Sequence, residues 1–230
     1  MNYYLSLAAL VPAVLLFIRV YRLDRIEKEP RRLLGKLIGL GALGAVPAAL
    51  VEVGLLYLLG RAAPRASAVY LLVRNFLIVA GSEELGKFLP VRLAAWRDPA
   101  FNYRFDAIVY AVSSSLGFAA VENLLYVIQS DLRTAVSRAV LSVPGHFFFA
   151  VSMGLFLSRA KQAESRGQLR RSQWLQAAAV LVPMALHGFW DFCLAVAAPW
   201  AAALFYVFVI LFFITADYSL RKASRMDGKL

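Results

Sequence analysis

The sequence predicts an all-α fold, a polytopic transmembrane helical bundle of about seven spans. Apolar residues make up 61% of the 230 residues, and the mean hydropathy is +0.66. Soluble domains contain roughly 45–50% apolar residues. Several apolar runs approach the ~20 residues needed to cross the hydrocarbon layer, and most Lys and Arg residues lie between those runs. We therefore expect a single integral-membrane domain over residues 1–230.

The expected helices follow the apolar runs in order along the chain. They lie at about residues 3–21, 37–60, 68–90, 105–129, 139–158, 174–197 and 199–218. The last two are separated only by a short turn that ends in Pro199 and Trp200.

The positive charges set the expected orientation of these helices. Of the 25 Lys and Arg residues, 18 lie in the connections 22–36, 91–104, 159–173 and 219–230, and only four lie in the connections on the opposite side. Cytoplasmic loops are enriched in Lys and Arg, so we expect the N-terminus outside and the C-terminus in the cytoplasm. The cations behind the net charge of +11 therefore lie in connections beside the lipid bilayer. For this reason we expect no nucleic-acid partner. We interpret the first of these connections as a solvated cytoplasmic hairpin.

Ionisable residues interrupt the apolar runs at a few positions. They are Glu83, Glu84, Lys87, Glu122, His146, His187 and Asp191, and they include both histidines of the chain. A charge at the centre of a bilayer costs ~3 kcal/mol on insertion scales. Glu, His and Asp are also the residues that bind metals and transfer protons. The pattern therefore favours chemistry, or ion movement, inside the membrane.

The adjacent acidic pair is followed by a lysine at helical spacing. Glu83 and Lys87 are four residues apart and share a helix face, whereas Glu84 is turned by ~100°. Two such glutamates can divide roles, with one meeting substrate or water and the other pairing with a cation. The alternative is a surface ion pair at the membrane boundary, which would contribute only ~0.3–0.5 kcal/mol.

Each histidine lies near a proline in its predicted helix. His146 follows a Pro-Gly pair, while Pro183, His187 and Asp191 are spaced at i, i+4 and i+8 on one face. A proline leaves backbone groups without helical partners, which the membrane tolerates only beside protein or water. The His187–Asp191 pair is typical of an imidazole whose orientation is fixed by a carboxylate.

If these helices converge, the chain could form a metal site. His146, His187 and a carboxylate such as Glu122 would make a His₂Glu set, which is typical of catalytic zinc with an open position. A second glutamate would then act as the base. No His-Glu-x-x-His motif occurs, so the ligands would have to come from separate helices.

The order of these motifs resembles that of a known protease family. The set Glu83-Glu84-x-x-Lys87, Phe118-x-x-x-Glu122-Asn123, His146 and His187-x-x-x-Asp191 resembles the PrsW family of intramembrane proteases. That family is a bacterial branch of the superfamily that includes CAAX prenyl endopeptidases. The resemblance covers about residues 80–192, which we take as the catalytic core helices. The superfamily's second motif usually ends in His, where this chain has Glu122.

The resemblance implies an activity and a set of roles. It implies site-2-type proteolysis of a single-span membrane protein, such as an anti-sigma factor, in a bacterial cell membrane as part of a signalling pathway. The implied catalytic residues are Glu83, Glu84 and Lys87, with Glu83 favoured as the base. The implied zinc ligands are Glu122, His146 and His187, with Asp191 and Asn123 in supporting positions.

Three other functions remain open at this stage. A CAAX-type prenyl endopeptidase is the nearest enzymatic alternative. A proton- or ion-coupled carrier would also bury Glu, His and Asp, although the sequence shows no internal repeat of the kind many transporters carry. A non-enzymatic membrane scaffold is the third.

Overall fold

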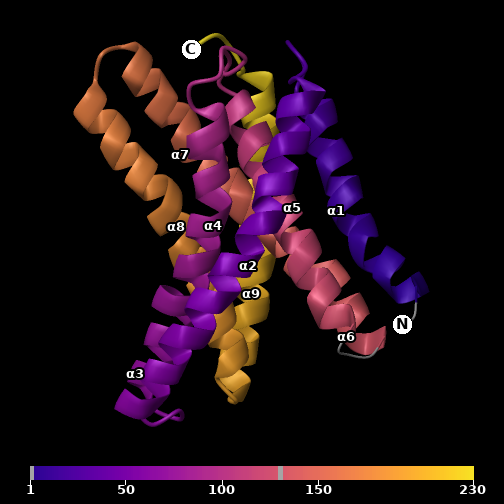
Figure 1. The fold of residues 1–230 in the computed structure, drawn as a ribbon, viewed down its shortest axis with the longest axis vertical. Helices are drawn as coiled ribbons and strands as arrows, with labels where there is room; N and C mark the ends of the chain where they lie inside the picture. The colour runs from indigo at the N-terminus through magenta and orange to yellow at the C-terminus, as the bar shows by residue number, and fades with distance from the viewer. Residues whose placement is uncertain (1–2, 129–131) are drawn as a thin grey trace.

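Seven helical rods make up the computed structural model, which describes residues 3–128 and 132–230 (Figure 1). The rods are α1 (Tyr3–Leu23), α2 (Arg31–Ala62), the continuous segment α3 (Ala68–Leu72), η1 (Val73–Val79), α4 (Ala80–Pro90) and η2 (Val91–Ala95), then α5 (Asp106–Ile128), the segment α6 (Leu132–Ser137), η3 (Arg138–Ser142) and α7 (Val143–Ser165), and finally α8 (Leu169–Ala195) and α9 (Pro199–Arg225). The described residues form no strand, so the prediction of an all-α bundle is confirmed.

Five of the helices are long and apolar enough to cross a membrane. They are Arg31–Ala62, Asp106–Tyr126, Arg138–Ser165, Leu169–Ala195 and Pro199–Arg225. The chain is therefore a membrane protein, while the count of seven crossings and the orientation stay predictions. The last two predicted helices are separate, because α8 ends at Ala195 and α9 begins at Pro199.

The ends of the bundle differ in what they contain. Figure 1 shows four features at one end of the bundle: the end of α9, the α7–α8 connection, and the connections 24–30 and 96–105. We call this end the connector end. The start of α1, together with α3, α6 and the α8–α9 turn, lies towards the other end. At the connector end, the C-terminal residues pair with the chain before α5, where the Arg104 N–H donates to the Gly228 carbonyl (3.0 Å).

One expectation about the connector end holds only in part. We predicted a solvated hairpin over residues 22–36, and residues 25–28 are exposed, but α2 already begins at Arg31, and Asp24 and Glu29 are only 1% and 3% exposed. The physical reason is that this connection folds onto the N-terminal end of α5. There the Tyr110 hydroxyl donates to the Glu29 carboxyl group.

Helix α5 lies at the centre of the bundle and packs against α1, α2, α4 and α7. Its close approach to α2 depends on two glycines. A Cβ at Gly41 would collide with the backbone oxygen of Ser114, and one at Gly117 would collide with that of Ile38. Small residues at helix crossings allow such backbone contact in membranes. This packing fixes α2 and α4 beside the polar residues of α5.

Candidate active site

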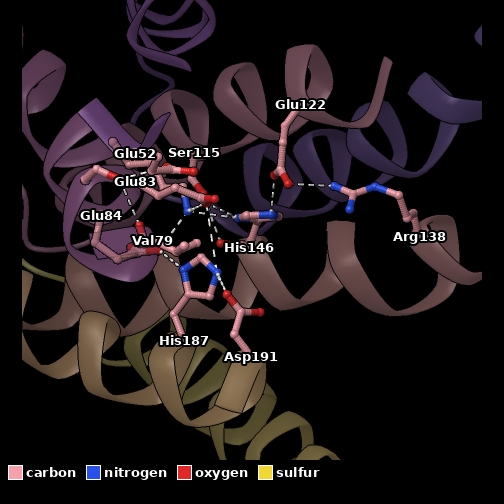
Figure 2. A network of polar contacts seen from close by, with 12 residues as sticks. Glu52, Val79, Glu83, Glu84, Ser115, Glu122, Arg138, His146, His187 and Asp191 are labelled. Carbon is pink, nitrogen blue, oxygen red and sulfur yellow. Dashed lines mark hydrogen bonds and ion pairs between the residues drawn. The ribbon is translucent and has the colours of Figure 1, made fainter. Parts of the chain in front are cut away.

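Four helices bring the predicted ionisable residues to one place inside the bundle (Figure 2). Glu83, Glu84 and Lys87 come from α4, Glu122 from α5, His146 from α7, and His187 and Asp191 from α8. We call this group the cavity cluster. The structure therefore brings together residues that are up to 108 positions apart in the sequence, while the roles assigned to them stay predictions.

Lys87 lies at the centre of the contacts and is fully buried. Its ammonium nitrogen lies 2.7 Å from Glu84 Oε1, 3.1 Å from Glu83 Oε2 and 2.9 Å from His146 Nδ1. It also stands 4.9 Å from the centre of the Phe118 ring. An ammonium has three hydrogens to donate, so all of them have acceptors, and two of these acceptors are carboxylates.

The contact with Lys87 determines which nitrogen of His146 carries a proton. An ammonium can only donate, so Nδ1 of a neutral His146 ring must accept and the ring proton must be on Nε2. That nitrogen lies 2.9 Å from Glu122 Oε2. The ring is thus held between α4 on one side and α5 on the other.

His187 is oriented mainly by Glu84. Its Nδ1 lies 2.9 Å from Glu84 Oε1, and its ring stacks on that of Phe149 at 5.0 Å between centroids. Its other nitrogen, Nε2, lies 3.4 Å from Asp191 Oδ2 and 3.9 Å from Glu83 Oε2. The shortest carboxylate contact of this imidazole is therefore with Glu84 rather than with the predicted partner Asp191.

Arg138 fixes the position of Glu122, and sequence reasoning missed it. Its Nη2 donates to Glu122 Oε1 (2.8 Å) and its Nε donates to Asn123 Oδ1 (2.9 Å). The guanidinium also stands 3.9 Å from the centre of the Tyr126 ring. The sequence had placed this arginine in a loop, and only its apolar C-terminal neighbours could have indicated a buried role.

A cavity of about 650 Å³ opens onto one side of the cluster. Its lining includes Glu83, Glu122, His146, His187 and Asp191, but neither Glu84 nor Lys87. The cavity continues past Arg74 of η1 and Ala195 of α8, which lie towards the end opposite the connector end. The two adjacent glutamates therefore differ, because Glu83 faces the cavity and Glu84 is 0% exposed behind it.

Glu52 of α2 also faces the cavity, and sequence reasoning missed this residue too. The Ser82 hydroxyl donates to its Oε1 at 2.7 Å, so Glu52 is tied to the residue that precedes Glu83. A signal was present in the sequence, because Glu52 is the single charged residue between Leu37 and Gly60. An ionisable residue within a membrane helix is a candidate for function.

Local backbone features explain how α7 and α8 can present their histidines. The π-helical segment η3 runs directly into α7 before His146, and π-helical turns are often found at functional sites. On α8, Gly188 packs directly on the backbone and ring of Phe76 in η1, where any Cβ would collide. The glycine thus lets the helix segment that carries His187 approach η1 closely.

Three side chains of the cluster could together hold a metal ion. One donor atom each from Glu83, Glu122 and His146 lies within 4.8 Å of the others. Glu122 Oε2 is buried and has no well-aligned hydrogen-bond partner, which suits a ligand atom. Binding through His146 Nε2 would move the ring proton to Nδ1, which now accepts from the Lys87 ammonium at 2.9 Å. Lys87 would then have to give up that contact and keep only those with the two glutamates. The residues fit a metal, although Glu83 replaces the predicted ligand His187 in this group.

Fold and site together define a helical membrane protein with an acid–base cluster and a cavity inside its bundle. The model of the family described as "PrsW family intramembrane metalloprotease" matches residues 29–216. The protein named Protease PrsW from Clostridioides difficile (strain 630) is 31% identical over 211 residues, which cover 90% of this chain and 86% of that protein. Protease PrsW from Shouchella clausii (strain KSM-K16) is 33% identical over 221 residues, covering 96% and 97%. Protease PrsW from Bacillus subtilis (strain 168) is 28% identical over 218 residues, covering 95% and 93%. No solved structure matches this chain.

These similarities extend over nearly the whole chain, well beyond the motif region. The protein is an intramembrane protease. It belongs to the PrsW family, as the order of its motifs predicted.

Proposed function

We propose that this protease cleaves a single-span membrane protein by means of a water molecule activated by Glu83. The observation that carries the proposal is the difference between the two adjacent glutamates. Glu83 lines the cavity, whereas Glu84 is sealed behind it by Lys87 and His187. A base must reach the water from which it removes a proton, and of the two glutamates only Glu83 lines the space where substrate and water can meet.

The other residues of the cluster supply the remaining requirements of peptide hydrolysis. Lys87 offsets part of the charge of Glu83 and Glu84, because its ammonium group contacts both carboxylates. His187 lines the cavity with its Nε2 between Asp191 and Glu83, where it can give a proton to the leaving amine. His146 and Glu122 line the cavity and would hold a metal ion, whose positive charge would stabilise the oxyanion.

We propose zinc as the metal of this site. Glu122 and His146 would hold it, and Glu83 stands close enough to be either the third ligand or the base beside it. A bound zinc would polarise the carbonyl group of the scissile peptide. Two carboxylates and one imidazole are donors that zinc accepts in proteins. In the other assignment, predicted from the sequence, the third ligand is His187.

We also propose a substrate class and a cellular location. The cavity lies inside the helical bundle, so a substrate must enter it from the membrane or from the end opposite the connector end. A single-span anti-sigma factor in the plasma membrane of a bacterium fits this requirement and would make the protease part of a signalling pathway. The relatives that match over most of this chain are bacterial proteins.

One panel of variants tests the proposed function. Detergent-purified wild-type protein is compared with Glu83→Gln, His146→Ala and His187→Ala for cleavage of a single-span reporter protein and for bound zinc. We expect each variant to lose about 10²–10⁴-fold in cleavage rate, the range for removal of a general acid or base, while its melting temperature shows that it is folded. Glu27→Gln, a change at an exposed glutamate of the connector end, is the control and should keep full activity.

The zinc content separates the two ligand assignments. Retention of zinc in His187→Ala would exclude His187 as the third ligand, and loss in both histidine variants would assign that position to His187. Loss in His146→Ala and Glu83→Gln alone would make Glu83 the third ligand in place of the base. A folded wild-type protein without zinc would contradict the metal site. Full activity in all three variants would contradict the catalytic assignment itself.

A further inference from the structure

Glu52 stands apart from the residues that the proposed mechanism uses, although it faces the same cavity. It comes from α2, which carries none of the motif residues, and it lines the cavity together with Glu83 (Figure 2). Gly41, Ala45 and Ala48 precede it on the packed face of α2, at spacings of four, three and four residues. The glutamate thus continues the face along which α2 packs into the bundle, and its carboxylate is directed inward instead of towards lipid.

Among the residues that the structure describes, only one of the two carboxylate oxygens of Glu52 has a partner. Oε1 accepts a hydrogen bond from the Ser82 hydroxyl (2.7 Å). Within the described part of the chain, Oε2 accepts no hydrogen bond and no Lys or Arg side chain pairs with the group. A carboxylate held by one oxygen, with the other free at a cavity wall, is a fixed acceptor for a donor that enters the cavity.

A peptide substrate brings donors of the required kind. To be cut, a membrane-spanning segment must unwind locally, and its backbone N–H groups then lose their helical partners. An unpaired N–H group away from water is costly, so the protease must supply acceptors at the place of unwinding. Of the cavity-lining acids described above, Glu83 is assigned to the water, Glu122 is bound by Arg138 and Asp191 lies beside His187.

We propose that Glu52 is a substrate-binding residue that accepts hydrogen bonds from backbone N–H groups of the unwound segment beside the scissile bond. This inference rests on the proposed protease function and deepens it. It names the class of ligand as an extended peptide with free N–H groups. Ser82 holds the carboxylate in place and links its position to that of the neighbouring Glu83.

Glu52→Gln is the informative substitution, because it changes the chemistry and keeps the shape. The amide oxygen can still accept from Ser82, while an NH₂ group that can only donate replaces the free acceptor. We expect the KM for a single-span substrate to rise about tenfold, in the range of one lost hydrogen bond, with kcat changed less than threefold. Ser82→Ala is the matched control, since it removes the internal hydrogen bond and leaves the carboxylate acceptor. Its KM should rise less than that of Glu52→Gln.

A binding experiment isolates the N–H groups themselves. The probe is a synthetic peptide of about 20 Leu and Ala residues, flanked by lysines, with a central Gly-Gly pair, together with the same peptide N-methylated at the two glycines. Binding is measured with Glu83→Gln protein in detergent, so that no cleavage occurs. We expect N-methylation to weaken binding about tenfold when Glu52 is present, and much less in the Glu83→Gln/Glu52→Gln protein.

The outcomes separate the inference from the proposed function. Equal effects of N-methylation with and without Glu52 would overturn the inference, while cleavage by the wild-type protein would leave the protease function intact. A loss confined to kcat in Glu52→Gln would also overturn it, because it would place Glu52 in the chemical step. Failure of the wild-type protein to cleave any single-span substrate would instead reject the proposed function, and the inference with it.

Discussion

The protein buries acidic side chains in two places, and it treats them differently. In the cavity cluster, Glu83 and Glu84 pair with Lys87, and Glu122 pairs with Arg138. At the connector end, four other acids are gathered around the start of α5, and we call them the connector cluster. They are Asp24, Glu29, Asp106 and Asp227.

The partners of the connector cluster are backbone groups, a hydroxyl group and, for Glu29 and Asp106, each other's carboxyl group. Asp106 Oδ2 accepts from the N–H groups of Asn102 (2.9 Å) and Tyr103 (2.6 Å), and Asp227 Oδ1 accepts from that of Phe105 (2.9 Å). Within residues 3–128 and 132–230, no Lys or Arg side chain forms an ion pair with these four acids. The cavity of the active site does not reach them.

The difference shows what makes a buried acid useful for chemistry. Cations pair with the carboxylates of the cavity cluster where a base or ligand is needed, and the cavity gives substrate access to Glu83 and Glu122. At the connector end the described acids form no ion pair with Lys or Arg, and the cavity does not reach them. They instead tie two connections to the C-terminal residues. Burial of an ionisable group inside this protein is therefore not sufficient to identify its active site.

Removal of Lys87 is the change with the largest expected effect on this contrast. In Lys87→Met, Glu84 would remain fully buried without its cation, and breaking a buried pair in this way costs about 3–5 kcal/mol. We expect a large fall in melting temperature in detergent together with loss of cleavage. Lys87→Met/Glu84→Gln, which removes both charges, should recover part of the stability and none of the activity. Wild-type stability in the single variant would show that the cluster does not depend on its counter-charge.

Arg138 tests the same principle with a smaller effect. Its side chain is only partly buried, and it holds Glu122 from outside the cluster. Loss of an outer partner of a ligand residue typically costs 10–100-fold in metal affinity or activity, so we expect Arg138→Gln to lose about tenfold in cleavage rate and to remain folded. Arg133→Gln, an exposed arginine of α6, provides the matched control. Equal rates for the two variants would exclude a role for Arg138 in placing Glu122.

The sequence was sufficient to predict most of the fold and the centre of the site. Long apolar runs become helices in a membrane because every backbone group must be paired there, so the order of the rods could be predicted. The ionisable residues within those runs could be recognised because each is costly in lipid. The same rule applied to Glu52, which was overlooked because it stands alone and carries no motif.

Other features depend on contacts that no local pattern contains. Arg138 reaches Glu122 only because α6 and η3 return along α5. No local pattern in the sequence predicts the direction in which the chain returns there. The burial of Asp24 and Glu29 was missed because their neighbours are charged, which is typical of a solvated loop. The π-helical turns of η1 and η3 add residues to a helix without changing its apolar character, so hydrophobic periodicity does not reveal them.

The connector cluster should respond to pH in a way that the cavity cluster does not explain. Burial raises the pKa of Asp24 from 3.8 to about 6 and that of Glu29 from 4.5 to about 9. The folded protein therefore binds these protons more tightly than the unfolded chain does. Stability from this source is complete below about pH 4, and it is lost as the pH rises through the two raised values.

We therefore expect the melting temperature in detergent to fall between pH 5 and pH 9, most steeply in the lower part of that range, where folded Asp24 and Glu29 both keep protons that the unfolded chain has lost. The fall should level off as the pH passes about 9 and folded Glu29 also loses its proton. Glu29→Gln keeps a neutral group that can still accept a hydrogen bond from Tyr110, so its melting temperature should vary less over that range. Glu27→Gln alters an exposed neighbour and should keep the slope of the wild-type protein. Identical slopes in wild-type and Glu29→Gln protein would mean that Glu29 stays ionised when buried. In that case the connector end, like the cavity, would have to contain a counter-charge, and the contrast between the two clusters would not hold.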